Sequence, residues 1–419
     1  MVAEAPNTGE AVPRWLDRAP EDPVMSAAAR GLAVDLVVEV DGERHVLRLS
    51  EPCTRLPAPA SDVAIVLRGS PDAFARILSP VPPPGYQSFG AVRRLARDVV
   101  VEADPVVEAQ ALAALERLFE LSRPGPATPG PQFARNEEAV TGRWSRLSAD
   151  IGGTPATARI FHLEAGRGLP LLFLHTAGAD ARQFRHQLAD AALQRRHRMI
   201  AFDMPWHGFS GGVDDCEAPE PYRLREAHYL AWCVAAITAL CGSPAVLAGC
   251  SMGADMALTV LAERPDLVAG VVALEAPLSS PGRRNPLLSD ARIAGGRHNP
   301  SYVRALLSPT APQARRDEAC AIYAQGRPGI YEGDLYYYSD EYDGARIAAS
   351  GRPVALLTGS YDYSAPPGST RALARAIGTD AILFRELPGF GHFPMIEDPE
   401  RFRPHFFEAL DWIDERRSP

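Results

Sequence analysis

The chain has 419 residues, of which 46% are hydrophobic and 23% charged, and its formal net charge at pH 7 is -9. The length exceeds one ordinary domain, and the composition is that of a globular protein. The negative charge argues against nucleic acid as a partner, and no apolar run is long enough to span a membrane. The N-terminus lacks the apolar segment of a signal peptide, so we expect a cytoplasmic protein. Six cysteines without a C-x-x-C pair predict neither a zinc site nor a disulfide framework.

The first part of the chain predicts a small α+β domain over residues 26–123. Residues 1–25 are rich in proline, alanine and acidic residues, and we expect them to be disordered. Alternating apolar residues, with a hairpin turn at Asp41-Gly42, predict a strand pair. Asp104 is a typical N-cap for an amphipathic helix. Strands are expected at 32–40, 44–49, 63–67 and 99–102, and helices at 71–78 and 105–121.

This order of elements carries a family resemblance. The hairpin, then SDVAIVLRGSPDAFARIL and VVVEADPVVEAQALAALERLFEL, resembles the sterol-carrier-protein-2-like domains over roughly residues 27–122. The resemblance implies an apolar groove between sheet and helices. We expect the groove to be filled and to serve as a packing or dimer surface. The alternative is that it holds part of a substrate or a lipid.

Residues 124–132 form a proline- and glycine-rich linker, and from residue 133 to residue 419 strands and helices alternate. Such alternation predicts a parallel sheet. Strands are expected at 158–163, 169–174, 198–202, 268–274, 354–357 and 381–387, with one more ending at the motif described next. Helices are expected at 181–193, 222–240, 369–377 and 399–416, and the alternation is interrupted by an insertion at about 277–351.

A serine lies at the apex of a predicted strand–turn–helix. The apolar strand ends in Gly249-Cys250-Ser251-Met252-Gly253, a Gly-x-Ser-x-Gly motif, and a helical pattern follows. A serine on so sharp a turn has strained backbone dihedrals, and side chains two positions before and after it would clash. The hydroxyl then projects beyond the end of the sheet, where the helix N-terminus favours negative charge. We therefore expect Ser251 to be a nucleophile.

A serine nucleophile needs a base and an acid that orients the base. Asp362 and His392 follow two later strands, and the order Ser251, Asp362, His392 is typical of an α/β-hydrolase triad. Glycines beside His392 let its loop bend back over the serine. Glu275, which directly follows the strand 268–274, is the alternative acid.

Two further loops end strands near this site. In Leu174-His175-Thr176-Ala177-Gly178 we expect the N–H of Ala177 to form an oxyanion hole with the N–H of Met252. The second loop contains Trp206. We expect His175, Thr176 and Trp206 to contact substrate.

Together these segments resemble the α/β-hydrolase superfamily over about residues 140–417. The loop from Asp203 to Ser210 is similar to the Asp-x-Pro-x-His-Gly-x-Ser of that superfamily, and its His207 is expected to be structural. The resemblance implies a mostly parallel sheet with helices on both faces and a cap. His175-Thr176 stands where His-Gly is usual. The resemblance also implies that haloalkane dehalogenases and epoxide hydrolases would use aspartate in place of Ser251.

The insertion at 277–351 falls where such enzymes carry a cap. Its tyrosines, Tyr336, Tyr337 and Tyr338 among them, combine apolar area with a hydroxyl and are candidates for the substrate pocket. The arginines of its first half are expected to form a solvated face, with recognition of an anionic substrate as the alternative.

These observations predict a serine hydrolase that cleaves a carboxyl ester or lactone of a mid-sized, mainly apolar small molecule. A carbon–carbon bond hydrolase acting on a β-diketone or ring-cleavage product would use the same residues. A non-catalytic ligand-binding protein with a lipid-carrying front domain is the alternative of another class. No cofactor or metal is expected, and the sequence leaves open whether the chain forms a homodimer.

Overall fold

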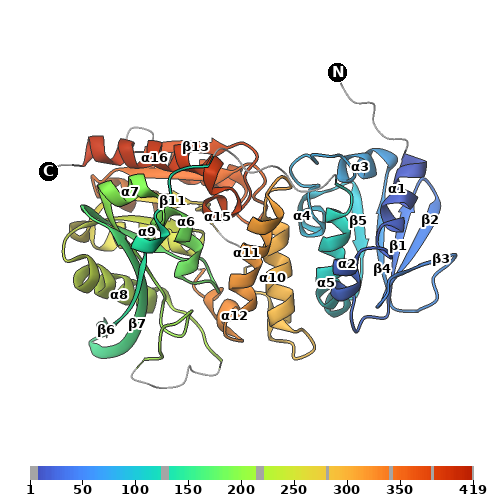
Figure 1. Ribbon diagram of the computed structural model, residues 1–419, viewed down its shortest axis with the longest axis horizontal. Coiled ribbons are helices and arrows are strands. Elements are labelled where there is room, and N and C mark those ends of the chain that lie inside the picture. Colours follow the sequence, from blue (N-terminus) through green and yellow to red (C-terminus); the bar gives the residue numbers. More distant parts are fainter. Residues whose placement is uncertain are drawn as a thin grey trace. The chain divides into compact units, whose positions relative to one another are not determined.

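The chain folds into two compact units. The computed structural model describes residues 8–123, 132–213, 221–279, 283–338, 343–378 and 382–417. The first unit comprises Met1–Ala127 and Pro286–Arg316, and the second comprises Thr128–Asn285 and Asp317–Pro419. Figure 1 labels their elements. The predicted linker falls, except for residue 132, outside the described residues.

The first unit is built on a five-stranded sheet in the order β3-β2-β1-β4-β5. The hairpin β1–β2 is antiparallel, as predicted, and β4 lies parallel to β1 on its other side. The short strand β3 was not predicted, because three partly exposed residues carry no clear alternation. The strands are β1 (Val34–Val40), β2 (Glu43–Leu49), β3 (Thr54–Leu56), β4 (Ala64–Gly69) and β5 (Val99–Glu102).

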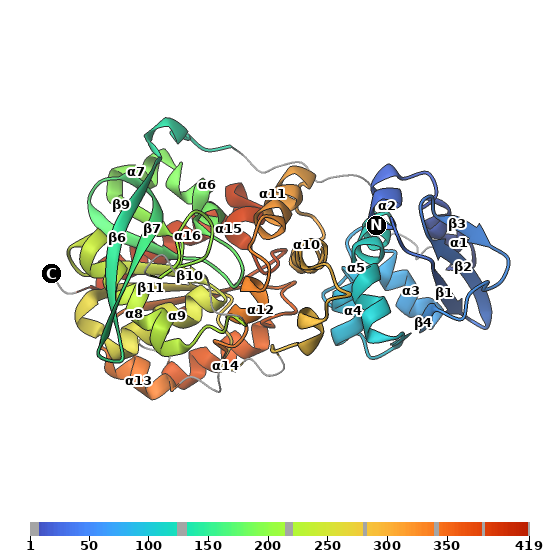
Figure 2. The same cartoon turned by 90° about the horizontal axis from the view of Figure 1, so that it is seen from below.

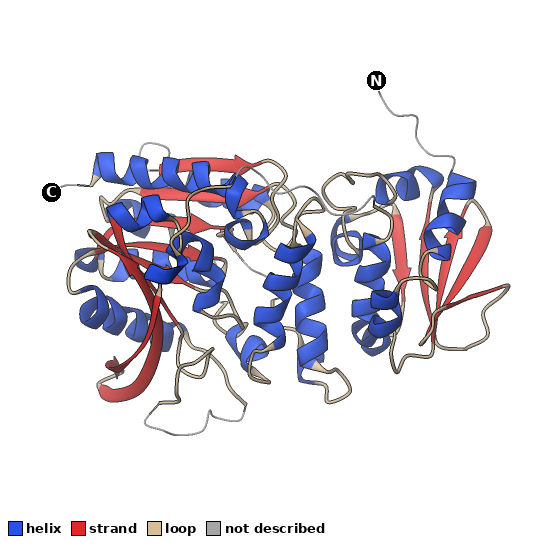
Figure 3. Ribbon diagram, viewed as in Figure 1, coloured by secondary structure: helices blue, strands red, loops and turns tan. Residues whose placement is uncertain are grey.

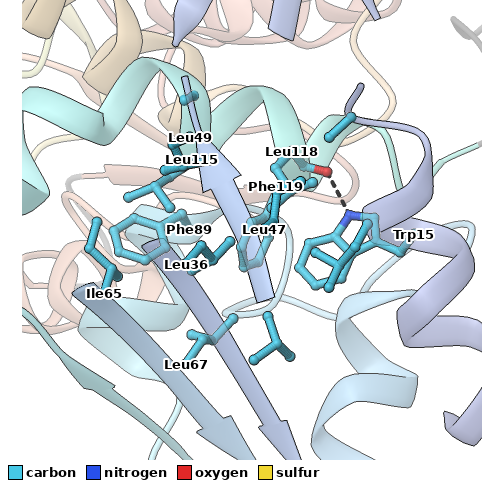
Figure 4. Packing of buried hydrophobic residues seen from close by; sticks show 14 of the residues in the cluster. Trp15, Leu36, Leu47, Leu49, Ile65, Leu67, Phe89, Leu115, Leu118 and Phe119 are labelled. Carbon is cyan, nitrogen blue, oxygen red and sulfur yellow. Dashed lines mark hydrogen bonds between the residues drawn. The ribbon is translucent and has the colours of Figure 1, made fainter. Parts of the chain in front are cut away.

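The helices of this unit cover the sheet, and their apolar side chains form the core of the unit together with those of the sheet. They are α1 (Thr8–Asp17), α2 (Pro23–Ala28), α3 (Pro71–Ile77), α4 (Phe89–Leu95), α5 (Pro105–Glu120), the 3-10 turn η5 (Pro286–Ser289) and α10 (Gly295–Leu306). Residues of the sheet, α4 and α5 fill the space between sheet and helices, as Figure 4 shows for Leu36, Leu47, Phe89 and Leu115. This packing agrees with the expectation of a filled groove.

The expected disorder of residues 1–25 is wrong for residues 8–25, which form α1 and the start of α2. Val12, Trp15 and Leu16 have the i, i+3, i+4 spacing of one helix face and are buried in the core. The indole N–H of Trp15 donates to the carbonyl of Leu118 at 2.6 Å (Figure 4). Composition suggested disorder, but the spacing of these three apolar residues is what decides the structure.

The first part of the predicted cap belongs to the first unit. Helix α10 packs against α5, as both Figure 1 and Figure 2 show, and Tyr302 contacts the core. The carboxylate of Glu120 is the centre of an ion network, 2.7 Å from Arg304 and 3.4 Å from Arg316. The division into units thus differs from the expected front domain at 26–123 and cap insertion at about 277–351, because residues 286–316 belong to the first unit.

The second unit is built on an eight-stranded sheet in the order β13-β12-β11-β10-β8-β9-β7-β6. The strands from β13 to β9 are parallel, and β7 and β6 are antiparallel to their neighbours. Figure 3 shows the strands in red and the helices in blue. The strands are β6 (Thr141–Ile151), β7 (Thr154–Gly166), β8 (Leu169–Leu174), β9 (His197–Phe202), β10 (Ala245–Cys250), β11 (Val268–Leu274), β12 (Val354–Gly359) and β13 (Ile382–Leu387).

Helices cover both faces of this sheet: α7 and α16 lie on one, and α8, α9, α13 and α14 lie on the other (Figure 2). The helices are α6 (Arg185–Leu188), α7 (Ala191–Arg196), α8 (Glu226–Ala236), α9 (Met252–Glu263), α12 (Ile330–Asp334), α13 (Gly344–Ala349), α14 (Pro367–Ile377), α15 (Pro394–Glu397) and α16 (Pro399–Arg416), while α11 (Gln313–Ala324) crosses from one unit to the other. The short turns are η1 (Glu137–Ala139), η2 (Ala181–Phe184), η3 (Ile237–Cys241) and η4 (Pro265–Leu267). In the described part of the chain, no helix combines the length and apolarity that crossing a membrane requires.

In this unit, one predicted helix is broken in the structure and one strand was not predicted. The helix expected at 181–193 is broken into η2, α6 and α7, because Asp190 accepts hydrogen bonds from two backbone N–H groups and starts a new helix. The strand β6 was missed, since it is a mostly exposed edge strand whose side chains are largely polar. The mixed sheet with helices on both faces is as expected.

Candidate active site

The turn between β10 and α9 carries Ser251 in a strained conformation, with φ 51° and ψ -119°. A Cβ atom at Gly249 would lie 2.2 Å from the carbonyl oxygen of Gly253. One at Gly253 would lie 2.1 Å from the carbonyl oxygen of Leu174. Both distances are far below van der Waals contact, so the crowding expected from the motif is present and only glycine fits at these two positions.

The expected acid and base lie together in the loops after β12 and β13. His392 Nδ1 is 2.6 Å from Asp362 Oδ2, and both side chains are buried. The other oxygen of Asp362 accepts the N–H groups of Ser364 and Ala365, at 2.7 and 3.0 Å. Burial alone would raise the pKa of Asp362, but the charge and hydrogen bond of His392 lower it, as do the hydrogen bonds from Glu275 and Ala365. Asp362 is therefore held as a carboxylate that fixes the imidazole with Nε2 free to act.

The histidine loop lies beside the serine turn. The thiol of Cys250, the residue before Ser251, donates to the carbonyl of His392 at 3.2 Å. Ser251 Oγ itself is 2.9 Å from the hydroxyl of Tyr338, and among the described residues no hydrogen bond joins it to His392. Catalytic hydrogen bonds are often long until substrate binds. In this state the hydroxyl of Tyr338 holds the expected nucleophile.

Glu275 lies directly behind Asp362. Its carboxyl group accepts the N–H of Gly359 at 2.8 Å and the hydroxyl of Thr358 at 3.0 Å, and it also hydrogen-bonds Asp362. Burial and the charge of Asp362 raise its pKa well above the ordinary value. Glu275 is therefore a neutral acid that donates its proton to Asp362, and the Nδ1 hydrogen bond of His392 goes to Asp362.

Asp362, Glu275 and His392 also form the group of potential metal ligands found among the described residues, with their donor atoms within 4.8 Å of one another. The proton of Glu275 and the Nδ1–H of His392 both face Asp362, so these side chains satisfy one another. A metal ion would have to displace both protons.

The expected oxyanion donors have no partner within the described part of the protein. On the loop after β8, Thr176 N donates to Gln183 Oε1 at 2.9 Å and Gly178 N donates to Asp334 Oδ2 at 2.7 Å. Between them, the N–H of Ala177 finds no acceptor among the described residues. Met252 is the first residue of α9, where backbone N–H groups lack an acceptor within the helix. Both remain available to an oxyanion.

His175 and Thr176 were expected to contact substrate, but the protein itself uses their polar atoms. His175 Nδ1 lies 2.9 Å from the carbonyl of Thr176, and its Nε2 accepts the N–H of Met204 at 3.2 Å. Burial lowers the pKa of His175 to about 4. The hydroxyl of Thr176 hydrogen-bonds Gln183 and Tyr323. These two residues brace the loop that holds Ala177.

The other expected substrate residues differ in their surroundings. Tyr338 is the one whose hydroxyl touches Ser251. Tyr337 is buried against the rings of Tyr229 and Tyr338, and Tyr336 is stacked by two arginines, Arg223 and Arg284. Trp206 has a left-handed φ of 66°, and its indole N–H is buried without a hydrogen-bond partner within the described residues. A polar group of a ligand would satisfy this N–H.

One part of the site was not predicted. Asp334, at the end of α12, is buried and lies 2.8 Å from Nε2 of His207. Its neighbourhood includes Tyr222, whose hydroxyl donates to it at 3.3 Å. Sequence gives no signal for this pair, since 127 positions separate the two residues. His207 is buried, and both of its ring nitrogens have hydrogen-bond partners.

The chain is similar to known hydrolases in sequence and in fold. Residues 171–404 match the alpha/beta hydrolase family. A stretch of 107 residues is 31% identical to (E)-2-((N-methylformamido)methylene)succinate hydrolase of Acinetobacter baylyi, and covers 26% of this chain but 37% of that relative. An esterase from Thermogutta terrifontis has a TM-score of 0.54 and 22% identity, over 64% of this chain and 99% of its own. The enol-lactonase from Burkholderia xenovorans has a TM-score of 0.54 and 19% identity, over 63% and 99%. At these identities the two structures show a shared fold.

Proposed function

The chain belongs to the alpha/beta hydrolase family, and from this we propose that it is a serine hydrolase that cleaves a carboxyl ester or lactone. The observation that carries the proposal is the strained turn at Ser251 beside the hydrogen-bonded pair Asp362–His392. Such an arrangement supports nucleophilic attack on a carbonyl carbon. The esterase and enol-lactonase structures that share the fold point to the same bond type.

In the proposed reaction, Ser251 Oγ bonds to the carbonyl carbon while His392 Nε2 takes its proton. The carbonyl oxygen becomes an oxyanion, which the N–H groups of Ala177 and Met252 stabilise. His392 then protonates the leaving alcohol, giving an acyl-enzyme. Water, deprotonated by His392, releases the acid and restores the serine. Asp362 stays ionised throughout and stabilises the imidazolium.

The proposed substrate is a mid-sized, mainly apolar molecule held beside the tyrosines of the insertion. Tyr338 lies on the reacting serine, and Tyr337 and Tyr229 supply buried aromatic surface next to it. The curated relative is named for a substituted succinate, so hydrolysis at a bond other than an ester is the second candidate. A carbon–carbon hydrolase acting on a β-diketone would use the same three residues.

For the front unit, we propose a structural role. We also propose that this unit is similar to the sterol-carrier-protein-2-like domains in its fold. Apolar side chains occupy the space between its sheet and helices, which supports packing over lipid transport. Retention of a fluorescent fatty acid by the intact protein would contradict this role.

The proposed mechanism is tested with a fluorophosphonate probe, which labels an activated serine covalently. The wild type should be labelled at Ser251 and Ser251→Ala should not, while Ser243→Ala, a change of the same kind before β10, should leave labelling intact. A panel of p-nitrophenyl esters, lactones and β-diketones then identifies the bond. Labelling at another serine, or turnover by Ser251→Ala, would refute the mechanism.

A further inference from the structure

A short helix of the insertion lies directly on the loop that carries the proposed oxyanion donor. A Cβ atom at Gly178 would lie 2.7 Å from the side chain of Tyr331, on α12. A Cβ atom at Gly333, also on α12, would lie 2.4 Å from the carbonyl oxygen of Tyr222. These contacts leave no room for any side chain, so α12 and the two chain segments beneath it are closely packed.

Asp334, at the end of α12, connects these segments through one buried carboxylate. Its Oδ2 accepts the N–H of Gly178 at 2.7 Å and lies 2.8 Å from Nε2 of His207. Its Oδ1 accepts the hydroxyl of Tyr222 at 3.3 Å. A buried carboxylate is stable only when it is paired and hydrogen-bonded, and these three partners meet that requirement.

The charges around the carboxylate favour an ion pair. Burial would lower the pKa of His207, but Asp334 outweighs this effect and raises it. The neighbouring His175 is neutral, because burial lowers its pKa to about 4, and burial with the charge of Asp180 raises the pKa of Asp203 to about 7. His207 is thus the cation that Asp334 faces.

The hydrogen bond to Gly178 completes a clamp on the oxyanion loop. The N–H before Ala177, that of Thr176, is held by Gln183, and the N–H after it is held by Asp334. These two hydrogen bonds fix the peptide groups on either side of Ala177. The N–H of Ala177 itself has no hydrogen-bond acceptor among the described residues. An oxyanion donor stabilises the transition state most when it is oriented before the reaction begins.

We infer that Asp334 is a positioning residue, which orients the oxyanion loop only when α12 of the insertion is seated on it. The inference rests on the proposed serine-hydrolase function. It makes seating of the insertion and readiness of the oxyanion hole a single event, because the same carboxylate is needed for both. Asp334 itself touches no reacting atom.

The test compares Asp334→Ala and Asp334→Asn with Asp343→Asn, a change of the same kind at the N-cap of α13. Asp334→Ala should lower kcat about 10²–10³-fold, the effect of losing one oxyanion donor, with little change in KM. Asp334→Asn keeps one acceptor oxygen but not the ion pair with His207, so its loss should be smaller. Asp343→Asn should behave as wild type.

The inhibition constant of a trifluoromethyl ketone distinguishes a positioning role of Asp334 from a general structural role, which would leave this constant unchanged. Ser251 Oγ adds to its carbonyl carbon, the proton goes to His392, and the resulting oxyanion occupies the hole. The inhibition constant should therefore rise in proportion to the loss of kcat/KM in the Asp334 variants. A raised KM with unchanged kcat, or unchanged affinity for the ketone, would overturn the inference.

The outcomes separate this inference from the proposed function. If the wild type is not labelled by the fluorophosphonate at Ser251, the proposed function fails. If it is labelled but the Asp334 variants turn over normally, the inference alone fails. If both Asp334 variants do not fold while Asp343→Asn does, the carboxylate serves folding and the inference is also overturned.

Discussion

Exchanging one carboxyl group for an amide at Asp362 and at Glu275 separates the two acids beside His392. In Asp362→Asn the amide faces His392 Nδ1, which is 2.6 Å from Oδ2 in the wild type, and stabilises the wrong tautomer. The other oxygen still accepts Ser364 and Ala365, so the loop keeps its shape. Loss of the orienting charge should lower kcat about 10⁴-fold, or about 5 kcal/mol.

The same exchange at Glu275 should cost far less. Glu275 is neutral in the folded protein, because burial and the charge of Asp362 raise its pKa. A glutamine amide donates to Asp362 in place of the acid O–H and keeps one of the two acceptor contacts, with Gly359 and Thr358. The loss of one hydrogen bond costs about 1 kcal/mol, which is less than about tenfold in kcat.

The assay is kcat for a p-nitrophenyl ester between pH 6 and 9, with thermal unfolding of each variant as the control for folding. Asp362→Asn should lose at least about 10³-fold more activity than Glu275→Gln. The reverse order would make Glu275 the orienting acid. Equal, large losses in two folded variants would contradict the description of Glu275 as a neutral donor.

Three further results are expected. Tyr338→Ala should cost about 1–3 kcal/mol in kcat/KM, because this ring is buried at Ser251, whereas Tyr336→Ala, at a half-buried ring stacked by arginines, should cost less. Burial raises the pKa of Glu116 from 4.5 to about 8, so the folded state retains a proton that the unfolded state loses. Stability should then fall as pH rises from 4.5 to 8, and the Tm of Glu116→Gln should fall less over this interval. Removing residues 1–131 should lower both stability and activity.

The parts of the site that follow from local sequence could be predicted. Gly249 and Gly253 are required by contacts within a few residues of Ser251 or with the adjacent strand, so a short motif was sufficient. Asp362 and His392 follow strand ends, and the ends of parallel strands meet at one edge of a sheet. The sequence favours Asp362 and keeps Glu275 as the alternative, since both side chains follow neighbouring strands; the structure adds that the Nδ1 hydrogen bond of His392 goes to Asp362.

The parts that depend on packing between distant segments could not be predicted. The partners of Asp334 come from loops more than a hundred positions away, and nothing near α12 in the sequence indicates them. The position of His175 and Thr176 at the end of a strand predicts contact with substrate, but their polar atoms are satisfied within the loop and by Gln183. In the N-terminal segment, composition predicts disorder, but the helical spacing of Val12, Trp15 and Leu16 allows these residues to be buried in the core.

The insertion is divided between the two units, so removing the front unit tests whether the part of the insertion near Ser251 depends on the front core. Residues 286–316 share the first unit's core, whereas Tyr323, at the other end of α11, hydrogen-bonds Thr176 beside the proposed oxyanion donor. A chain beginning at residue 132 exposes the face of α10 that covers α5 and leaves Arg304 and Arg316 without Glu120. Loss of these ion pairs and exposure of the apolar surface should disorder α10 and loosen α11, the next helix along the chain. We therefore expect slower fluorophosphonate labelling of Ser251 and a lower Tm in the second unit, and full labelling at the wild-type rate would show that the insertion holds the site without the front core.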